Sequence, residues 1–507
     1  MAKYLLGIDN GGTVAKAALF DPAGSEIAVA SDRIETTSPQ PGWDERDAEK
    51  LWEATVAAIR KVLDESKIDP AEILCIAAAG HGNGIYLVDE SGKPVRNAIY
   101  SADSRARSYV EQWAADGVDV AVRPRTTQAI WPAQPNALLA WLRDHEPETL
   151  AKTTWVLMCK DFIRLRLTGE ARAELTDMSG TSLINVVTSE YDPEVLEAFG
   201  IPEMQKFFPP LVKSADLCGK VTAEAAALTG LAEGTPVAGG MFDIDACGLS
   251  SSITDESQLC MILGTWGNNQ YISREPVVED VFMTSCYSIP GYYLMLEGSA
   301  TSASNLEWFI DQFFAAEAAA AREQGRSVYD IINEAVAATG AADAGILFFP
   351  FLYGSNMDPD STACLIGLSD RHTRGHVLRA IYEGVVFAHL THLERLLKFR
   401  DMPERIRVSG GASRSDVWVQ MIADIFQVPV DVPEGSELGA LGAAICAAVA
   451  IGEHDSYQAA CDAMVTFSRS FEPNADLAEV YKGKYARYKR ALEALAPAWA
   501  ELVWQQT

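Results

Sequence analysis

The first 30 residues alternate apolar runs with short turns, which is typical of strands joined in sequence. Apolar residues dominate 4–8 and 14–20, and polar residues and glycines fill the gap between these runs. A third apolar run, 27–30, follows a turn at 21–24. A short glycine-rich gap between two such runs predicts a hairpin, and the third run extends it. The chain is therefore expected to open with a three-stranded meander.

Helical spacing appears only after these strands. Beyond the capping residue Asp47, the positions that recur at the period of a helix face are Leu51, Thr55, Ile59, Val62 and Leu63. A dinucleotide-binding fold needs its glycine turn to run directly into a helix that holds the pyrophosphate. Because a strand follows the first glycine turn here, the sequence excludes that fold.

The pattern of strand, glycine turn and strand occurs a second time. Residues 258–263 lead into Gly264 and Thr265, and the apolar character resumes at 270–272. Gly264 follows Gly11 by 253 positions, close to half of the 507 residues. Two such halves indicate a duplicated architecture with a ligand between them. The glycine- and proline-rich stretch 234–240 is the expected seam.

A third glycine loop lies between a strand and a helix. Residues 406–409 have strand character, Gly410, Gly411 and Ala412 follow, and apolar positions at helical spacing come next. Helix N-termini and paired glycines offer backbone N–H groups to a phosphate or a flat ring. We expect a nucleotide contact at this loop.

Composition and charge narrow the class of partner. With 70 acidic and 41 basic residues the net charge is −29, which disfavours nucleic acid and anionic membranes. The most apolar uncharged run, 438–452, is shorter than the roughly 18 residues of a membrane span, and its alanines and glycines suit close helix packing. The N-terminus lacks signal-peptide features. Nine scattered cysteines without a C-x-x-C pair indicate buried thiols in a cytoplasmic protein.

The first glycine turn carries the groups needed to hold terminal phosphates. It offers backbone donors, a hydroxyl and a cation, from Gly11, Gly12, Thr13 and Lys16. Asp9, at the end of the preceding strand, is a candidate Mg2+ ligand through water. The alternative is an ordinary turn without a ligand.

Asp243 is the candidate general base. It follows a glycine pair and lies among apolar residues, which would desolvate its carboxylate, raise its pKa and make it a better base. The alternatives are that Asp243 caps a helix beginning near Ile244, or that Asp245 does so. His389 and His392, at helical spacing, are interpreted as packed residues, because the H-E-x-x-H motif is absent. The G-x-S-x-G and P-loop signatures are absent too.

Together these motifs resemble the FGGY family of carbohydrate kinases over essentially the whole chain. Residues 363–384 fit the family's C-terminal signature, and 135–142 fit the N-terminal one, with Leu138 in place of the usual lysine. The resemblance implies an α/β fold of the actin-like ATPase (ribonuclease H-like) class. It implies two similar domains, 1–246 and 247–507, with a central cleft. Family members often dimerise, so a homodimer is one expectation.

The family's site residues carry over motif by motif. The resemblance makes Asp243 the catalytic base and Asp9 to Thr13 the first phosphate motif. It makes Gly264 and Thr265 the second phosphate motif and Gly410, Gly411 and Ala412 the adenosine motif, with ATP and Mg2+ as implied cofactors. Gly12 and Val14 replace hydroxyl residues often found in the first motif. A phosphate contact there is either lost or made by the backbone.

Within the family, the chain resembles pentulose kinases, particularly xylulose and L-xylulose kinases. The implied sugar contacts are His81, Gly82, Asn83 and Asp103, and Ser101 replaces a tryptophan of the motif that contains Asp103. The implied reaction is ATP-dependent phosphorylation of a ketopentose at its terminal primary hydroxyl, giving the 5-phosphate and ADP. The alternatives are another substrate, such as ribulose, erythritol, glycerol or a hexulose, and a non-catalytic actin-like ATP switch.

Overall fold

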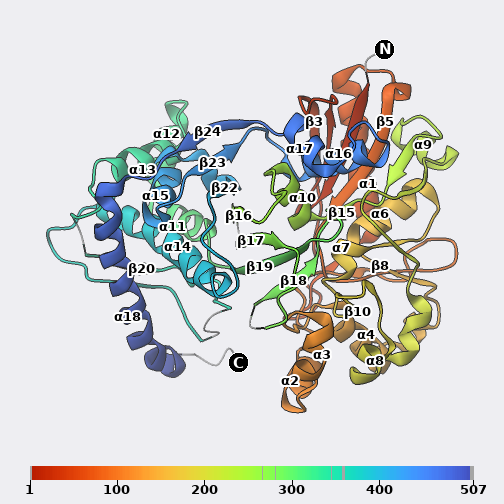
Figure 1. Ribbon diagram of the computed structural model, residues 1–507, viewed down its shortest axis with the longest axis horizontal. Helices are drawn as coiled ribbons and strands as arrows, with labels where there is room; N and C mark the ends of the chain where they lie inside the picture. Colours follow the sequence, from red (N-terminus) through yellow and green to blue (C-terminus); the bar gives the residue numbers. More distant parts are fainter. Residues whose placement is uncertain (1–2, 265, 280, 344, 357–359, 503–507) are drawn as a thin grey trace. The chain divides into compact units, whose positions relative to one another are not determined.

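The computed structural model describes residues 3–264, 266–279, 281–343, 345–356 and 360–502, which fall into two compact units (Figure 1). Unit 1 consists of Met1–Thr254, Ile272–Met295 and Gly435–Thr466. Unit 2 consists of Asp255–Tyr271, Leu296–Glu434 and Phe467–Thr507. Each unit is therefore assembled from three separate stretches of the chain.

Unit 1 is built on a seven-stranded sheet in the order β13-β14-β5-β1-β2-β3, with β15 also paired to β5. β1 (Tyr4–Asn10), β2 (Val14–Phe20) and β3 (Glu26–Arg33) form the predicted antiparallel meander, whereas β5 (Ile73–Gly80) pairs with β1 in parallel. The helix α1 (Ala48–Ser66) packs on β2 and β3. Its N-cap Asp47 accepts hydrogen bonds from the backbone of Glu49 and Lys50. The predicted meander, helix and cap are confirmed.

A small-residue helix from the C-terminal half completes unit 1. The helix α16 (Leu438–Ala450) packs on β1, β5 and α10 (Asp243–Ser250), and Figure 1 shows it in blue beside the red and orange strands. A Cβ at Gly442 would overlap the Ala246 carbonyl oxygen, and one at Gly439 would overlap the Asp9 carboxylate. Glycine is the residue that permits this approach. The expectation of close helix packing is confirmed.

The remaining elements of unit 1 are mostly short. Many of its buried hydrophobic residues belong to one of two clusters, the first between the sheet and α1 and the second around α4. The main elements are β4 (Glu45–Arg46), β6 (Tyr86–Val88), β7 (Ala98–Ile99), α2 (Arg107–Ala115), α3 (Val118–Thr126), α4 (Pro135–His145), β8 (Trp155–Leu157), α6 (Cys159–Thr168), α7 (Leu175–Met178), α8 (Pro193–Ala198), β13 (Leu217–Lys220), α9 (Ala223–Thr229), β14 (Pro236–Ala238), β15 (Met241–Phe242), β18 (Met283–Cys286) and α17 (Tyr457–Met464).

Unit 2 contains the second glycine hairpin. β16 (Gln258–Leu263) and β17 (Gly267–Ser273) are antiparallel, and β22 (Arg405–Ser409) pairs with β16 in parallel. From β19 onward the order of this sheet is β19-β17-β16-β22-β23-β24, with β19 at Tyr293–Ser299, β23 at Val430–Pro433 and β24 at Phe467–Phe471. Its helices are α11 (Ser304–Phe313), α12 (Ala315–Glu323), α13 (Val328–Ala337), α14 (Arg374–Leu396), α15 (Asp416–Phe426) and α18 (Ala478–Leu502). The predicted hairpin and the strand before Gly410 are confirmed.

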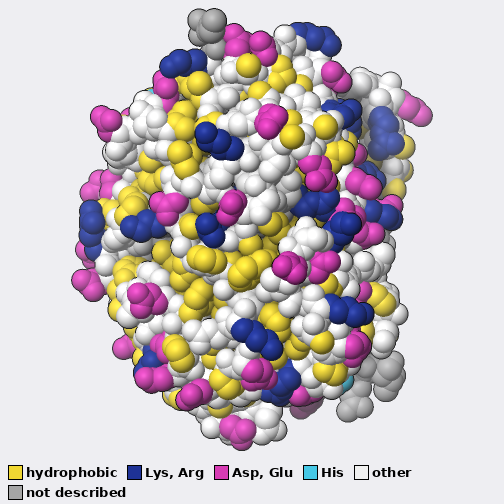
Figure 2. Space-filling model, turned by 90° about the vertical axis from the view of Figure 1, so that its right-hand side faces the viewer, with side chains coloured by type: hydrophobic (Ala, Val, Ile, Leu, Met, Phe, Trp, Pro, Cys, Tyr) yellow, Lys and Arg dark blue, Asp and Glu magenta, His cyan; other side chains and the backbone are white. Residues whose placement is uncertain are grey.

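The cysteines, the apolar helices and the surface charge each bear on an expectation from composition. All nine cysteines are free, but Cys247 and Cys364 are only partly buried, so the expectation of buried thiols is wrong for these two. Within the described ranges, no helix combines the length and apolar character that crossing a membrane requires. On the face shown in Figure 2, acidic and basic side chains are interspersed, so the net negative charge does not form one continuous acidic patch on that face.

Candidate functional site

The first glycine turn joins β1 to β2 in unit 1. The strand register pairs Asp9 with Lys16, which leaves Gly11 and Gly12 near the tip of the hairpin. Lys16 Nζ lies 2.6 Å from an oxygen of Glu437, in the segment that leads into α16. The cation predicted to meet phosphate is therefore partly neutralised by a carboxylate of its own unit.

Asp9 is the last residue but one of β1 and is partly buried under α16. Burial raises the pKa of its carboxyl to about 6, although the Lys16 ammonium opposes the rise; the Glu437 carboxylate adds to it. A carboxyl with this pKa is mostly ionised at neutral pH. Asp9 thus offers carboxylate oxygens, the ligands that hard divalent cations prefer.

Parallel strands bring three of the predicted motifs to one edge of the sheet. In the register, Asn10 of β1 lies opposite Gly80 of β5, and Phe242 of β15 lies opposite Gly80 as well. The residues that follow these strands are Gly11, His81 and Asp243. The carboxyl ends of parallel strands are where α/β sheets bind ligands. The first phosphate turn, a predicted sugar contact and the predicted base therefore converge within unit 1.

Asp243 is the first residue of α10 and is partly buried. Burial raises the pKa of its carboxyl well above the usual value, and the nearby carboxylates of Asp9 and Asp177 raise it further. A carboxylate with a raised pKa is a stronger proton acceptor. The environment of Asp243 is thus suited to a general base.

Neither aspartate at the start of α10 is its capping residue. The N-cap is Phe242, without a side-chain hydrogen bond to the helix. Asp245 is fully buried, and its Oδ1 accepts hydrogen bonds from the backbone N–H (3.0 Å) and the hydroxyl (3.1 Å) of Ser288. Asp245 therefore holds a neighbouring segment in place and Asp243 remains available for chemistry.

A fully buried ion cluster is formed by residues of α6, of α7 and of the N-cap of α7. Lys160 Nζ is 3.1 Å from Asp177, 3.3 Å from Asp161 and 3.4 Å from Glu174. Burial and the other carboxylates raise the pKa of Asp177 to about 7, although Lys160 opposes the rise. One oxygen of Asp177, Oδ1, has no hydrogen-bond partner among the described residues. The cluster thus holds a carboxyl group that titrates near neutral pH.

This cluster is connected to β15, the strand that directly precedes Asp243. The backbone N–H of Phe242 donates to Thr176 Oγ1 at 3.0 Å, and the Thr176 hydroxyl donates to Glu174 at 2.7 Å. The residue before Asp243 is therefore held by Thr176, whose hydroxyl is bonded to a carboxylate, Glu174, that also lies beside Lys160. These bonds position the start of α10.

The predicted sugar contacts at 81–83 are buried and polar. His81 Nε2 lies 3.0 Å from Tyr86 Oη, and burial together with the charge of Arg46 lowers the pKa of His81 to about 3, so the ring is neutral at physiological pH. Asn83 adopts a left-handed backbone (φ 59°), and its Oδ1 has no partner among the described residues. A Cβ at Gly82 would overlap the Phe242 ring. This segment offers a neutral imidazole and an unused acceptor, which suit a polyol.

Asp103 already has a full set of partners. Its carboxylate accepts the backbone N–H of Asp44 at 2.7 Å and that of Arg105 at 2.8 Å, and it pairs with the Arg105 guanidinium at 2.9 Å. The side chain is completely buried. Direct contact of Asp103 with a sugar, which stays a prediction, would require one of these bonds to be exchanged.

Unit 2 has a cavity of about 590 Å³ beside its glycine loops. Gly264, Gly411 and Ala412 line it together with Tyr329 and Asn333. Gly410 has a φ of 93°, and a Cβ there would overlap the Leu263 carbonyl. The second phosphate motif and the adenosine motif therefore meet at one cavity, whereas Thr265 lies outside the described residues.

Comparisons with known proteins agree with this arrangement of motifs. The model for the FGGY family of carbohydrate kinases, N-terminal domain, matches residues 4–249, and that for the C-terminal domain matches 259–451. The chain belongs to the FGGY family of carbohydrate kinases. The kinase is 39% identical to L-xylulose/3-keto-L-gulonate kinase of Escherichia coli (strain K12), over 98% of each chain. It is 37% identical to a probable L-xylulose kinase of Pasteurella multocida (strain Pm70), over 97% of this chain and 99% of that one.

A solved structure gives the same result for the fold. Xylulose kinase from Rhodospirillum rubrum superposes with a TM-score of 0.88 at 27% identity, covering 98% of the kinase and 100% of that chain. The α/β, actin-like ATPase fold, the family and the assignment as a carbohydrate kinase are confirmed.

The sequence analysis missed residues that the fold brings to the motifs from distant segments. Glu437 follows its partner Lys16 by more than 400 positions, and Arg46, described below, had no recognisable signal. Lys160 and Asp177 are not among the predicted site residues either. A buried lysine among acids has no sequence signature, because isolated charged residues are usually solvated.

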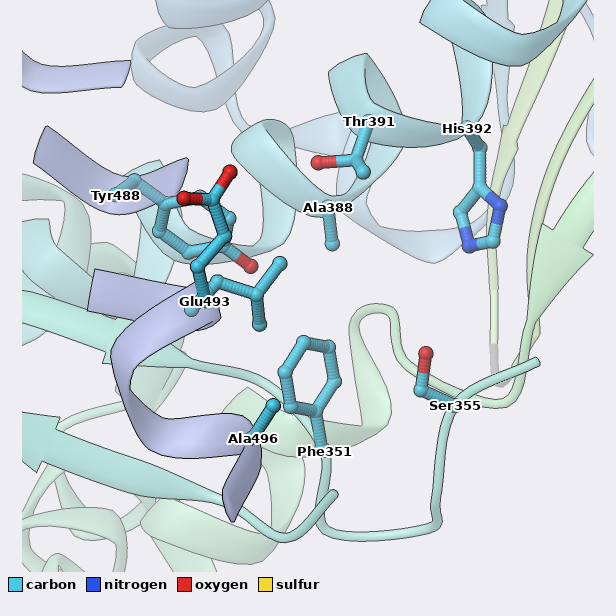
Figure 3. A pocket seen from close by; sticks show the side chains of 9 residues that line it. Phe351, Ser355, Ala388, Thr391, His392, Tyr488, Glu493 and Ala496 are labelled. Atoms are coloured by element: carbon cyan, nitrogen blue, oxygen red, sulfur yellow. The ribbon is translucent and has the colours of Figure 1, made fainter. Parts of the chain in front are cut away.

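Unit 2 of the kinase contains a second, smaller cavity of about 230 Å³ between α14 and α18 (Figure 3). Figure 3 shows Phe351 and Ala496 on one side and Thr391 and His392 on the other. The buried hydroxyl of Tyr488, another lining residue, has no partner among the described residues. His392 Nε2 is 2.8 Å from Ser299 Oγ, so the interpretation of this histidine as a packed residue is confirmed.

Proposed function

We propose that this kinase transfers the terminal phosphoryl group of ATP to the terminal primary hydroxyl of a ketopentose of the xylulose or L-xylulose type. The products are the 5-phosphate and ADP. Support comes from two relatives, an L-xylulose/3-keto-L-gulonate kinase and a probable L-xylulose kinase, which are 39% and 37% identical over nearly their whole length. Ribulose, erythritol and glycerol are the alternative substrates.

The observation that carries the proposal is the convergence of Asp9, His81 and Asp243 at one sheet edge. Asp243 would accept the proton of the attacking hydroxyl, because its raised pKa makes it a stronger base than an exposed carboxylate. The sugar would be held by His81, Gly82, Asn83 and Asp103. Each buried polar group left unpaired by a wrong epimer costs about 1–3 kcal/mol, which gives stereochemical selectivity.

The carboxylates in unit 1 fit a magnesium ion that arrives with the nucleotide. Mg2+ usually binds one or two carboxylates and keeps its remaining sites for phosphate and water. Asp9, with Asp243 close enough to be influenced by its charge, matches that donor set. The described residues contain no group of three or more side chains suited to a protein-only metal site. Asp9 would hold the ion through water, and the ion would neutralise charge on the phosphates.

The nucleotide would be held by all three glycine motifs. The base and ribose would occupy the 590 Å³ cavity beside Gly410, Gly411 and Ala412. The phosphates would meet the backbone of Gly264 and Thr265 and the first turn, which comprises Gly11, Gly12, Thr13 and Lys16. We propose that domain 1–246 carries the sugar and first phosphate motifs and domain 247–507 the others, so that transfer requires both domains.

The decisive experiment is an ADP-release assay with the purified kinase across D-xylulose, L-xylulose, 3-keto-L-gulonate, both ribuloses, glycerol and erythritol. We expect the highest kcat/KM for a xylulose, with release dependent on Mg2+. A profile in which glycerol or erythritol exceeds every pentulose would overturn the substrate assignment. ATP hydrolysis that no polyol stimulates would favour the non-catalytic switch.

A further inference from the structure

Arg46 places a fully buried guanidinium beneath the first glycine turn. Its relative exposure is 0%, although arginine is rarely so buried without a partner of opposite charge. Nη1 donates to the Gly11 carbonyl at 3.3 Å, and Nη2 donates to the Gly12 carbonyl. Arg46 therefore binds two successive carbonyl groups of the predicted phosphate loop.

The charge of Arg46 is not neutralised within the described part of the chain. No carboxylate there lies within 4 Å of its guanidinium, whereas the other deeply buried arginines of unit 1, Arg105 and Arg164, both pair with aspartates at 2.9 Å. Its neighbours are Tyr86 and Tyr100, and the Tyr100 ring lies 4.5 Å from the guanidinium carbon. Burying an unpaired charge is costly. An unpaired buried charge of this kind is expected where it acts on a bound group of opposite charge.

The two carbonyls held by Arg46 determine where the loop's donors point. In a trans peptide, the C=O of one residue and the N–H of the next face opposite sides. Carbonyls of Gly11 and Gly12 that face the guanidinium therefore direct the N–H groups of Gly12 and Thr13 away from it. Backbone N–H groups arranged in this way form the anion cradles of phosphate loops.

We propose that Arg46 is a positioning residue of the first phosphate loop. It orients the N–H groups of Gly12 and Thr13 toward the phosphoryl group, and its unneutralised positive charge favours an anion at that end of the sheet. This inference rests on the proposed function for the identity of the anion, while the loop geometry stands independently of it.

The kinetic test compares Arg46→Met and Arg46→Lys with Arg166→Met. Arg166 is a matched control, because it also lies over an aromatic ring of unit 1, that of Trp52, but has a carboxylate partner, Glu49. For Arg46→Met we expect kcat to fall at least about tenfold and the sugar KM to stay within about twofold. Arg46→Lys keeps the positive charge but cannot donate to both carbonyls in the fixed geometry of a guanidinium. Its kcat should therefore lie between those of the wild type and Arg46→Met. A normal kcat for Arg46→Met, or an equal loss in Arg166→Met, would overturn the inference.

A second test does not depend on catalysis. Hydrogen exchange of the peptide covering residues 4–20 is measured in the wild type and the same variants. We expect faster exchange at the loop in Arg46→Met, with unchanged exchange in the sheet strands and in Arg166→Met. Unchanged loop exchange would contradict the positioning role. If the wild type phosphorylates no polyol while loop exchange responds as expected, the proposed function fails and the structural role of Arg46 stands.

Discussion

At the scale of single residues, the raised pKa of Asp243 leads to a direct prediction for catalysis. Asp243→Asn keeps the shape of the side chain and removes the proton acceptor. We expect kcat to fall by about 10²–10⁴-fold, the range for removal of a general base, while ATP still binds. Turnover by rapid-quench measurement and ATP binding by calorimetry would check this. Near-normal turnover would remove Asp243 from the mechanism.

The same substitution should change stability in a pH-dependent way. Because the folded-state pKa of Asp243 is raised, the folded protein binds more protons than the unfolded chain between the two pKa values, and stability falls as pH rises through that window. Asp243→Asn removes this loss. Urea unfolding should therefore show Asp243→Asn more stable than wild type at about pH 8, with a smaller difference at about pH 4. If the variant and the wild type differ in free energy of unfolding by the same amount at both pH values, the pKa of Asp243 is not raised in the folded state.

The hydroxyl of Tyr100 explains why glycine occupies position 12. A Cβ at Gly12 would lie 2.7 Å from the Tyr100 hydroxyl, and the Tyr100 ring is held against Arg46 and edge-on to His81. Tyr100 thus leaves no room for a side chain at position 12. We expect Gly12→Ser to lower kcat. Adding Tyr100→Phe should restore much of the loss, because without the hydroxyl the nearest Tyr100 atom to the Cβ at position 12 is Cζ, at 3.9 Å. Additive losses in the double-variant cycle would contradict this.

At the scale of secondary structure elements, α16 depends on a glycine at its contact with α10. Gly442→Ala would force a Cβ into the Ala246 carbonyl, and we expect a loss of about 1–3 kcal/mol in the free energy of unfolding. Gly483→Ala in α18 is the matched control, because that glycine is exposed with open space around it. The control should gain about 0.5–1 kcal/mol from helix propensity. Chemical denaturation of both variants measures the contrast, and similar effects at the two sites would refute it.

Local elements could be predicted from the sequence because their signals are local. The hairpins around Gly11 and Gly264, the Asp47 cap and the strand before Gly410 each depend on residues within a few positions. Arg46 could not be predicted in this way, because it lies in a two-residue strand, β4, and its partners come from another hairpin. Periodicity describes which face of an element is buried and says little about which distant residue meets it.

At the scale of the whole molecule, the sequence indicated a duplication, but it did not indicate which stretches of the chain belong to which of the two units. Segment Gly435–Thr466, near the C-terminus, belongs to unit 1 and brings both α16 and Glu437 to the first hairpin. Contacts across such sequence separations leave no periodic signal. The convergence of Asp9, His81 and Asp243 also depends on the parallel register of β1, β5 and β15, which appears only in the folded sheet.

The division of motifs between the two units leads to a prediction about the two substrates. Gly411 lines the unit 2 cavity with open space around it, so Gly411→Val should fill part of the cavity without disturbing the fold. Asn83, in unit 1, has a buried acceptor without a partner in the described structure. We expect Gly411→Val to raise the KM for ATP by at least about tenfold with little change for the sugar, and Asn83→Ala to do the reverse. Initial rates over a grid of both concentrations separate the two constants. If either variant raises the KM for ATP and the KM for the sugar equally, the two substrates are not bound by separate units. The assignment of the nucleotide to unit 2 and of the sugar to unit 1 is then wrong.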